Sequence, residues 1–226
     1  MELSLSKLSR RPVGPVLFTE AGHAGAKPER KRDRAAKQHA LMQAAKTLFA
    51  RRGYDATTTR EIAACAGCAE GLIHRYFNGK AGLFLGVVQY RISQEVAELN
   101  DRLPLAAKFE DEIARLVDWE IERMWEDRDF LKVIIPRALL DPAVGKVLFQ
   151  VATSRSIPAI VDRLRRFKDY SHLGQEALEA YARLVDLLGF SFGFLRPVLM
   201  GQDHAEARKS AMKLVKVLVR QVQSAA

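Results

Sequence analysis

Two short motifs in the sequence have the residue types and spacing of reactive sites, and the first is a pair of thiols. Cys65 and Cys68 form a Cys-x-x-Cys motif, a spacing typical of disulfide exchange or of half of a zinc site. Zinc would need two further ligands, and the only nearby imidazole is that of His74. We favour ordinary packing for the cysteines, with a thiol switch as the alternative, and predict no metal site and no cofactor.

The second motif is Gly-x-Ser-x-Gly, from Gly189 to Gly193, which matches the nucleophile elbow of serine hydrolases. That elbow needs a strand before the serine, whereas this motif lies within one apolar helical pattern from Leu184 to Leu195. Glycines four residues apart lie on the same face of a helix and let a second helix approach closely. We therefore predict helix packing here rather than catalysis.

Acidic residues gather in the segment 107–127. Asp118, Glu122 and Glu126 are spaced to share a helix face, as in a dinuclear metal site, but no Glu-x-x-His accompanies them and a solvated face is favoured. Glu120 instead falls among apolar residues, where it is a candidate to line a pocket or to pair with an arginine. The candidate partners are Arg137, Arg155 and Arg196.

Composition narrows the class of protein. The chain has 226 residues, is 48% hydrophobic and contains two cysteines, so it can bury a core without disulfides. Its longest relevant apolar run, from Leu187 to Leu195, is nine residues, against the roughly 18 that a membrane span needs. The opening MELSLSKLSRRPVG lacks the apolar core of a secretory signal. We expect a soluble cytoplasmic protein that does not enter a membrane.

The positive charge is concentrated near the N-terminus. Residues 1–90 hold 15 Lys and Arg and 7 Asp and Glu, a net charge of +8, whereas residues 91–226 hold 21 and 20, a net charge of +1. A basic segment joined to a near-neutral one is typical of a polyanion-binding domain on a separate body. A basic patch that only aids solubility is the alternative.

The elements that must position these residues are helices. Apolar residues recur at i, i+3, i+4 and i+7, and we find no alternating run of β type, so the predicted fold class is all-α. Residues 1–32 lack this periodicity and hold three prolines, which predicts a disordered basic arm. The expected helices cover residues 33–52, 59–66, 70–77, 80–103, 107–127, 129–140, 142–167, 175–199 and 204–223.

Local signals indicate where several helices begin and end. Thr58 and Glu61 form a capping box before 59–66, and Gly53 follows the preceding helix where a left-handed residue ends it. Pro136 and Pro158 should kink or break their helices.

The two short helices 59–66 and 70–77, joined by a tight turn at Gly67, have the spacing of a helix-turn-helix. In that motif the first helix braces against the DNA backbone and the second lies in the major groove. The stretch ALMQAAKTLFARRGYDATTTREIAACAGCAEGLIHRYFNGKAGLF, residues 40–84, resembles the DNA-binding domain of the TetR family of bacterial transcriptional regulators.

The resemblance implies a three-helix DNA-binding domain at 33–84 and a larger helical ligand-binding and dimerisation domain at 85–226. It also implies roles for individual residues. Phosphate contacts would come from the helix starts, and the second helix of the motif would face the bases, with Tyr76 either at a phosphate or packed. The DNA-binding candidates are Thr58, Thr59, Arg60, Ala69, Glu70, Leu72, His74, Arg75, Tyr76 and Lys80.

Three positions depart from the pattern of the family. Ala69 replaces the usual Ser or Thr at the N-cap of the second helix, which loses a cap worth about 1 kcal/mol. His74 replaces a phosphate-contacting Tyr, and Cys68 replaces an aliphatic residue. These departures leave the sequence and affinity of the operator open.

A ligand pocket in the helical body should combine apolar walls with a few polar groups. The candidates are Trp119, Glu120, Met124, Trp125, Phe130, Ile134, Phe149, Tyr181 and Phe192, each of which also suits an ordinary core. The helix about 175–199 is apolar on two faces, so one face should meet its own domain and the other a second subunit. The helix about 204–223 carries one apolar stripe, made of Ala207, Ala211, Leu214, Val215, Leu218 and Val222, and is expected to share the dimer interface.

These observations predict a homodimeric transcriptional regulator, a repressor that a small, largely apolar ligand releases from a palindromic operator. A helical enzyme or small-molecule carrier is the alternative from another class, although no complete catalytic constellation supports it. An activator or a redox sensor with the same DNA-binding domain also stays open, as does a minor-groove role for the arm.

Overall fold

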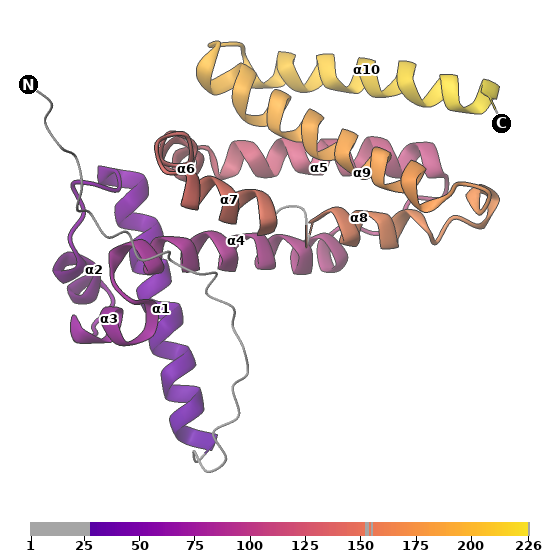
Figure 1. Ribbon diagram of the computed structural model, residues 1–226. Helices are drawn as coiled ribbons and strands as arrows, with labels where there is room; N and C mark the ends of the chain where they lie inside the picture. Colours follow the sequence, from indigo (N-terminus) through magenta and orange to yellow (C-terminus); the bar gives the residue numbers. More distant parts are fainter. Residues whose placement is uncertain (1–27, 152–153, 155, 226) are drawn as a thin grey trace, which may run out of the picture.

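The computed structural model describes residues 28–151, 154 and 156–225, and all regular elements within these ranges are helices (Figure 1). The all-α prediction is confirmed. None of the helices described is long and apolar enough to cross a membrane. In chain order they are α1 (Pro28–Arg52), α2 (Thr59–Cys65), α3 (Gly71–Phe77), α4 (Lys80–Arg102), α5 (Phe109–Glu126), α6 (Arg128–Leu140), α7 (Pro142–Val151), α8 (Ile157–Leu164), the 3-10 turn η2 (Lys168–Tyr170), α9 (Gln175–Phe190), the π-helix η3 (Ser191–Leu199) and α10 (His204–Ala225).

Two clusters of buried side chains hold the helices together. The first joins α1 to α4 with α6 and α7, around Phe49, Ile73 and Phe130. The second joins the end of α4 to α5, α8, α9 and α10, around Ile113 and Ile160. The helices α5, α8, α9 and α10 of the second cluster form a second body, and Figure 1 shows α4 running from the three-helix unit α1–α3 along it. Because α4 contributes to both clusters, it connects the two bodies mechanically.

The first helix begins earlier than its periodicity predicts. We assigned residues 1–32 to a disordered arm, whereas residues 28–32 are already helical. Pro28 suits the first position of a helix, since its φ is fixed and its missing N–H would have no partner there. Residues 1–27 lie outside the described residues, so the arm stays a prediction for them.

The predicted helix ends around α2 are confirmed. The hydroxyl of Thr58 accepts the N–H of Glu61 at 3.2 Å, and the Glu61 carboxylate accepts the N–H of Thr58 at 2.9 Å, which completes the capping box. Gly53 (φ 80) and Gly67 (φ 61) follow α1 and α2 in the left-handed region. The turn at Gly67 directs α3 across α2, as a helix-turn-helix requires.

Two long helices of the prediction are each divided in the structure. The segment 142–167 forms α7 and α8, and α8 begins at Ile157 because Pro158 fits only the first turn of a helix. Pro136, in contrast, lies inside α6 without ending it. The segment 175–199 changes at Ser191 from α9 to the π-helix η3, which is wider than an α-helix and contains Pro197.

Gly189 and Gly193 mark the place where α9 and η3 press against α5. A Cβ on Gly189 would lie 2.5 Å from the Cβ of Glu120, and one on Gly193 would lie 2.5 Å from the carbonyl oxygen of Ile121. Only glycine permits this approach, so the prediction of helix packing is confirmed. Ser191 follows helix α9 rather than a strand, so the geometry is not that of a nucleophile elbow.

A fully buried ion pair fastens α8 to α5. The Nε of Arg163 lies 2.5 Å from the carboxylate of Glu112, and the two residues are 2% and 0% exposed. Arg163 also donates to the carbonyl groups of Leu99 and Leu103, and Glu112 accepts the N–H of Ala106. These bonds hold the far end of α4 against the second body.

Candidate functional site

The short helix α3 is anchored on one side by the first core. Ile73 and Phe77 are buried, and Leu72 and Tyr76 are half-buried against the same cluster. Of the predicted DNA contacts, Leu72 is therefore mostly a packing residue. Tyr76 is a packed ring with its edge near the surface, and the guanidinium of Arg34 lies 5.3 Å from the ring centroid.

The opposite face of α3 is open to a partner. Ala69, Glu70, His74 and Arg75 are exposed. The predicted N-cap at Ala69 is wrong by one residue, because α3 begins at Gly71 and Glu70 is its N-cap. The Glu70 side chain makes no capping hydrogen bond. The start of α3 therefore lacks a side-chain cap, as predicted, although the N-cap is Glu70 and not Ala69.

Glu70 is held by α2 instead. The hydroxyl of Thr59 donates a 2.6 Å hydrogen bond to the Glu70 carboxylate, which ties the start of α3 to the start of α2. Both residues were predicted to contact DNA, and here each is the partner of the other. The bond fixes the orientation of the exposed carboxylate at the N-terminal end of α3.

The helix starts on either side carry the remaining candidates. Arg60 is exposed beside Thr58, whose hydroxyl is engaged in the capping box. Lys80 donates a 3.3 Å hydrogen bond to the carbonyl of Asp55, and its ammonium lies 4.4 Å from the ring centroid of Tyr54. Burial lowers the pKa of Lys80. Arg60 is thus available to a phosphate as it stands, whereas Lys80 is partly engaged within the protein.

The two thiols occupy different environments. Cys65 is exposed at the end of α2, while Cys68 is half-buried and packs against the first core. Packing therefore accounts for Cys68. In the part of the chain that the structure describes, no group of three or more His, Cys, Asp and Glu side chains is placed to hold a metal ion.

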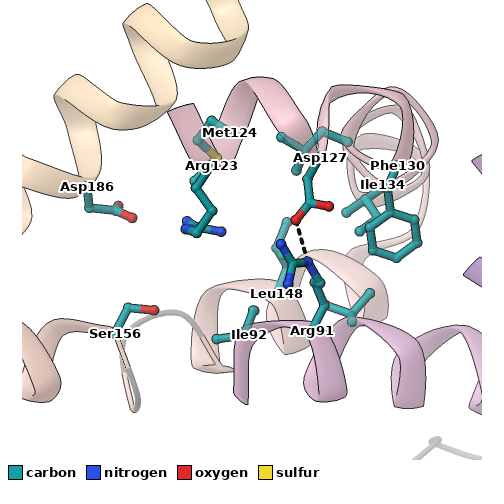
Figure 2. Close-up of a pocket in the computed structure, with 12 residues that line it drawn as sticks. Arg91, Ile92, Arg123, Met124, Asp127, Phe130, Ile134, Leu148, Ser156 and Asp186 are labelled. Atoms are coloured by element: carbon teal, nitrogen blue, oxygen red, sulfur yellow. Dashed lines mark hydrogen bonds and ion pairs between the residues drawn. The ribbon is translucent and has the colours of Figure 1, made fainter. Parts of the chain in front are cut away.

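A cavity of about 90 Å³ lies between the two bodies (Figure 2). The lining side chains come from helices α4, α5, α6, α7 and α9. Two more are those of Asp127, which follows α5, and Ser156, which precedes α8. The cavity is lined by Val88, Arg91, Ile92, Arg123, Met124, Asp127, Phe130, Leu131, Ile134, Leu148, Ser156 and Asp186.

The structure brings three of the nine predicted pocket residues to this cavity: Met124, Phe130 and Ile134. The other six lie elsewhere. Trp119, Tyr181 and Phe192 pack with the second core, and Phe149 is 67% exposed. The remaining two, Glu120 and Trp125, lie on α5 and make an ion pair and a stacking contact, respectively.

Glu120 is buried and lies 2.5 Å from Arg123 of its own helix, rather than pairing with Arg137 or Arg196, and Arg155 lies outside the described residues. Trp125 stacks on His204 at the start of α10, with 4.5 Å between ring centroids. Both serve the helix packing around α5.

Sequence reasoning missed the other nine residues of the cavity wall, among them Asp127, which lies between α5 and α6. Its carboxylate lies 3.1 Å from the ammonium of Lys46 on α1 and 2.5 Å from the guanidinium of Arg91 on α4. Figure 2 shows the bond to Arg91 at the edge of the cavity. Three helices and the cavity wall therefore meet at one buried carboxylate.

The outer face of α9 and α10 exposes large apolar side chains. Leu187 of α9 is 62% exposed, and in Figure 1 α10 lies outermost on this side. The predicted stripe on α10 is in fact two faces, because Val215 and Val219 are buried while Leu214, Leu218 and Val217 are exposed.

Solved structures with this arrangement of helices are transcriptional regulators. A putative TetR-family regulator from Mesorhizobium loti MAFF303099 matches with a TM-score of 0.65 and 22% identity, over 83% of this chain and 96% of that one. The transcriptional regulator FadR from Bacillus subtilis in complex with stearoyl-CoA matches with a TM-score of 0.61 and 14% identity, over 78% of this chain and 96% of that one. A putative transcriptional regulator from Saccharomonospora viridis in complex with choline matches with a TM-score of 0.59 and 18% identity, over 80% of this chain and 96% of that one. The chain shares the overall fold of these proteins.

Sequence comparison finds similarity to bacterial regulators. Residues 41–87 match the model of bacterial regulatory proteins of the tetR family. YerO, an uncharacterized HTH-type transcriptional regulator of Bacillus subtilis (strain 168), is 26% identical over 106 residues, which make up 46% of this chain and 37% of that protein. The similarity to the tetR family therefore covers the N-terminal segment that contains the helix-turn-helix.

Proposed function

We propose that the protein is a sequence-specific, homodimeric transcriptional repressor that binds a palindromic operator in the cytoplasm. The observation that carries the proposal is the open face of α3, held by α2 within a TetR-family domain. A helix presented in this way fits the major groove, where base edges can be read. The net charge of +8 over residues 1–90 would attract the phosphate backbone.

In this proposal the two ends of the motif have different tasks. Thr58, Thr59 and Arg60 contact phosphates, with Lys80 as a further contact once it leaves Asp55. The base-facing set is Ala69, Glu70, His74 and Arg75, with the half-buried Leu72 and Tyr76 at its border. We assign residues 33–84, extended back to Pro28 by α1, to DNA binding and residues 85–226 to effector binding and dimerisation.

The exposed apolar face of α9 and α10 is the proposed dimer interface. Exposed side chains such as Leu187 and Leu218 would be buried against the same residues of a second copy. A two-fold axis through this face would present two copies of α3 to successive major grooves, about one helical turn of DNA apart.

The cavity is the proposed effector site. Its volume of about 90 Å³ is below the roughly 300–1,000 Å³ typical of ligand pockets, so an effector would have to widen it. Widening would separate α4 from the start of α6 and strain the contacts of Asp127 with Arg91 and Lys46. Since Lys46 lies on α1, this movement would reach the DNA-binding domain and release the operator.

A fluorescence-anisotropy titration tests the proposed function. The duplex upstream of the coding region of the protein is compared with a scrambled duplex of the same length, at physiological salt. We expect affinity for the first to exceed that for the second by at least ~10³-fold. Equal, weak binding to both, repeated with duplexes tiled over the neighbouring intergenic regions, would contradict the proposal and favour a helical small-molecule carrier.

A further inference from the structure

Asp186 of α9 is a carboxylate of the cavity wall. Figure 2 shows its side chain pointing into the cavity, at the opposite end from Phe130 and Ile134. Among the residues that the structure describes, none forms a hydrogen bond or an ion pair with it. Burial, and then repulsion by Glu120, raise the pKa of Asp186, while Arg123 and Arg183 oppose the rise.

The two arginines of the cavity, in contrast, already have carboxylate partners. Arg91 lies 2.5 Å from Asp127, and Arg123 lies 2.5 Å from Glu120. Lys46 adds a second cation to Asp127 at 3.1 Å. Each of these three cations is thus in direct contact with Asp127 or Glu120, whereas no described residue makes such a contact with Asp186. A cationic group of a ligand could supply that contact.

We propose that the effector is an apolar molecule carrying a protonated amine, and that Asp186 binds the amine. This inference rests on the proposed function and gives the chemistry of the molecule that fills the cavity. The apolar body would lie against the wall around Ile92 and Phe130, and the ammonium group would donate to Asp186, with Ser156 at the same end (Figure 2). An acidic effector would meet the carboxylate of Asp186 and would have to displace Glu120 or Asp127 from an arginine.

Three probes of nearly the same shape separate charge from size: benzylamine, benzyl alcohol and benzoate. Each is titrated into the full-length protein without DNA at pH 7, where benzylamine is protonated, and binding is followed by calorimetry. We expect benzylamine to bind most tightly, by about 10- to 100-fold over benzyl alcohol, since a charge-assisted hydrogen bond forms in a partly water-excluded site. The Asp186→Asn variant should lose this advantage.

Glu179→Gln is the matched control. It removes one negative charge from the same helix, at a residue that pairs with Arg183 and does not line the cavity, so the preference for benzylamine should persist. Thermal unfolding of both variants without probe verifies that they fold. Benzoate binding at least as tightly as benzylamine, or an unchanged preference in Asp186→Asn, would overturn the inference.

A second arm separates this inference from the proposed function. Benzylamine is added to the complex of the protein with its operator duplex, and release of the duplex is expected for the unmodified protein but not for Asp186→Asn. Binding of benzylamine without release would overturn its role as an effector analogue. Failure of the unliganded protein to bind any duplex specifically would instead count against the proposed function.

Discussion

The ammonium of Lys46 lies 3.1 Å from the carboxylate of Asp127, although the two residues are 81 positions apart in the chain. The pair joins α1, part of the proposed DNA-binding domain, to the corner between α5 and α6. Asp127 also accepts from Arg91 of α4 and borders the cavity, so one carboxylate contacts both proposed domains and the proposed effector site. This junction directly connects the cavity wall to α1.

Asp127→Asn tests the strength of this junction. The substitution leaves Lys46 and Arg91 without their carboxylate, and we expect the free energy of unfolding to fall by about 2 kcal/mol, less than for a fully buried pair because Lys46 is one-third exposed. Urea unfolding followed by circular dichroism gives the value. Asp129→Asn is the control, since its ion pair with Lys132 is exposed and should contribute less than about 0.5 kcal/mol. Equal losses in the two variants would contradict the assigned role of Asp127.

The helix-turn-helix unit could be predicted from the sequence because its signals are local. Thr58 and Glu61 are three residues apart, and their capping box, the turn at Gly67 and the apolar spacing of α1 and α2 all act within a few residues. These signals predicted the helix-turn-helix and the exposed side of α3, although they set the start of α3 one residue early.

The cavity could not be predicted in the same way. Its charged residues meet through tertiary packing, as Arg91 and Asp127 do across 36 residues, and periodicity contains no information on such pairs. Large aromatic side chains suggested a pocket, but Trp125 stacks on His204 instead, and such ring pairs stabilise an aromatic side chain without any ligand.

Arg60 and Glu70 should affect DNA binding differently. Arg60→Ala removes a proposed phosphate contact, so affinity for all duplexes should fall by a similar factor and the slope of log K against log salt should decrease by about 0.9. Glu70→Ala removes a proposed base-facing group and frees the hydroxyl of Thr59, so the preferred sequence should change. Anisotropy titrations over a series of salt concentrations and single-base operator variants measure both effects. If Arg60→Ala leaves the affinity unchanged, the proposed docking of α2 is wrong.

The dimer interface is tested by Leu187→Glu. A charge at this exposed position of α9 would have to be buried in the proposed interface, and we expect sedimentation equilibrium to report the mass of one chain instead of two. Leu139→Glu on α6 is the control, because Leu139 is even more exposed but lies on another helix. The control should stay dimeric, and circular dichroism verifies that both variants are folded. A dimeric Leu187→Glu protein would place the interface elsewhere.

Asp186 should make stability depend on pH. Burial and Glu120 raise its pKa above the ordinary value of 3.8, against weaker opposing effects of Arg123 and Arg183, so the folded state holds the proton more tightly than the unfolded state. The stabilisation is therefore present at low pH and is lost as the pH rises from 3.8 through the raised pKa. Asp186→Asn should remove this loss, and its stability at pH 7 should equal or exceed that of the unmodified protein.

Urea unfolding between about pH 4 and pH 7 measures that dependence, with Glu179→Gln as the control whose profile should follow the unmodified protein. Parallel profiles for the unmodified protein and Asp186→Asn would show that the carboxylate is not perturbed by its position in the cavity.

Selection of binding sites from a random duplex library tests the central claim most directly, because it finds the preferred DNA sequence without assuming an operator. The full-length protein is incubated with random 30-base-pair duplexes at physiological salt, and bound DNA is sequenced over successive rounds. A homodimer that presents two copies of α3 should enrich an inverted repeat with half-sites about one helical turn apart, near 10 base pairs. Enrichment of no sequence, or of a single half-site without symmetry, would contradict a dimeric, sequence-specific repressor.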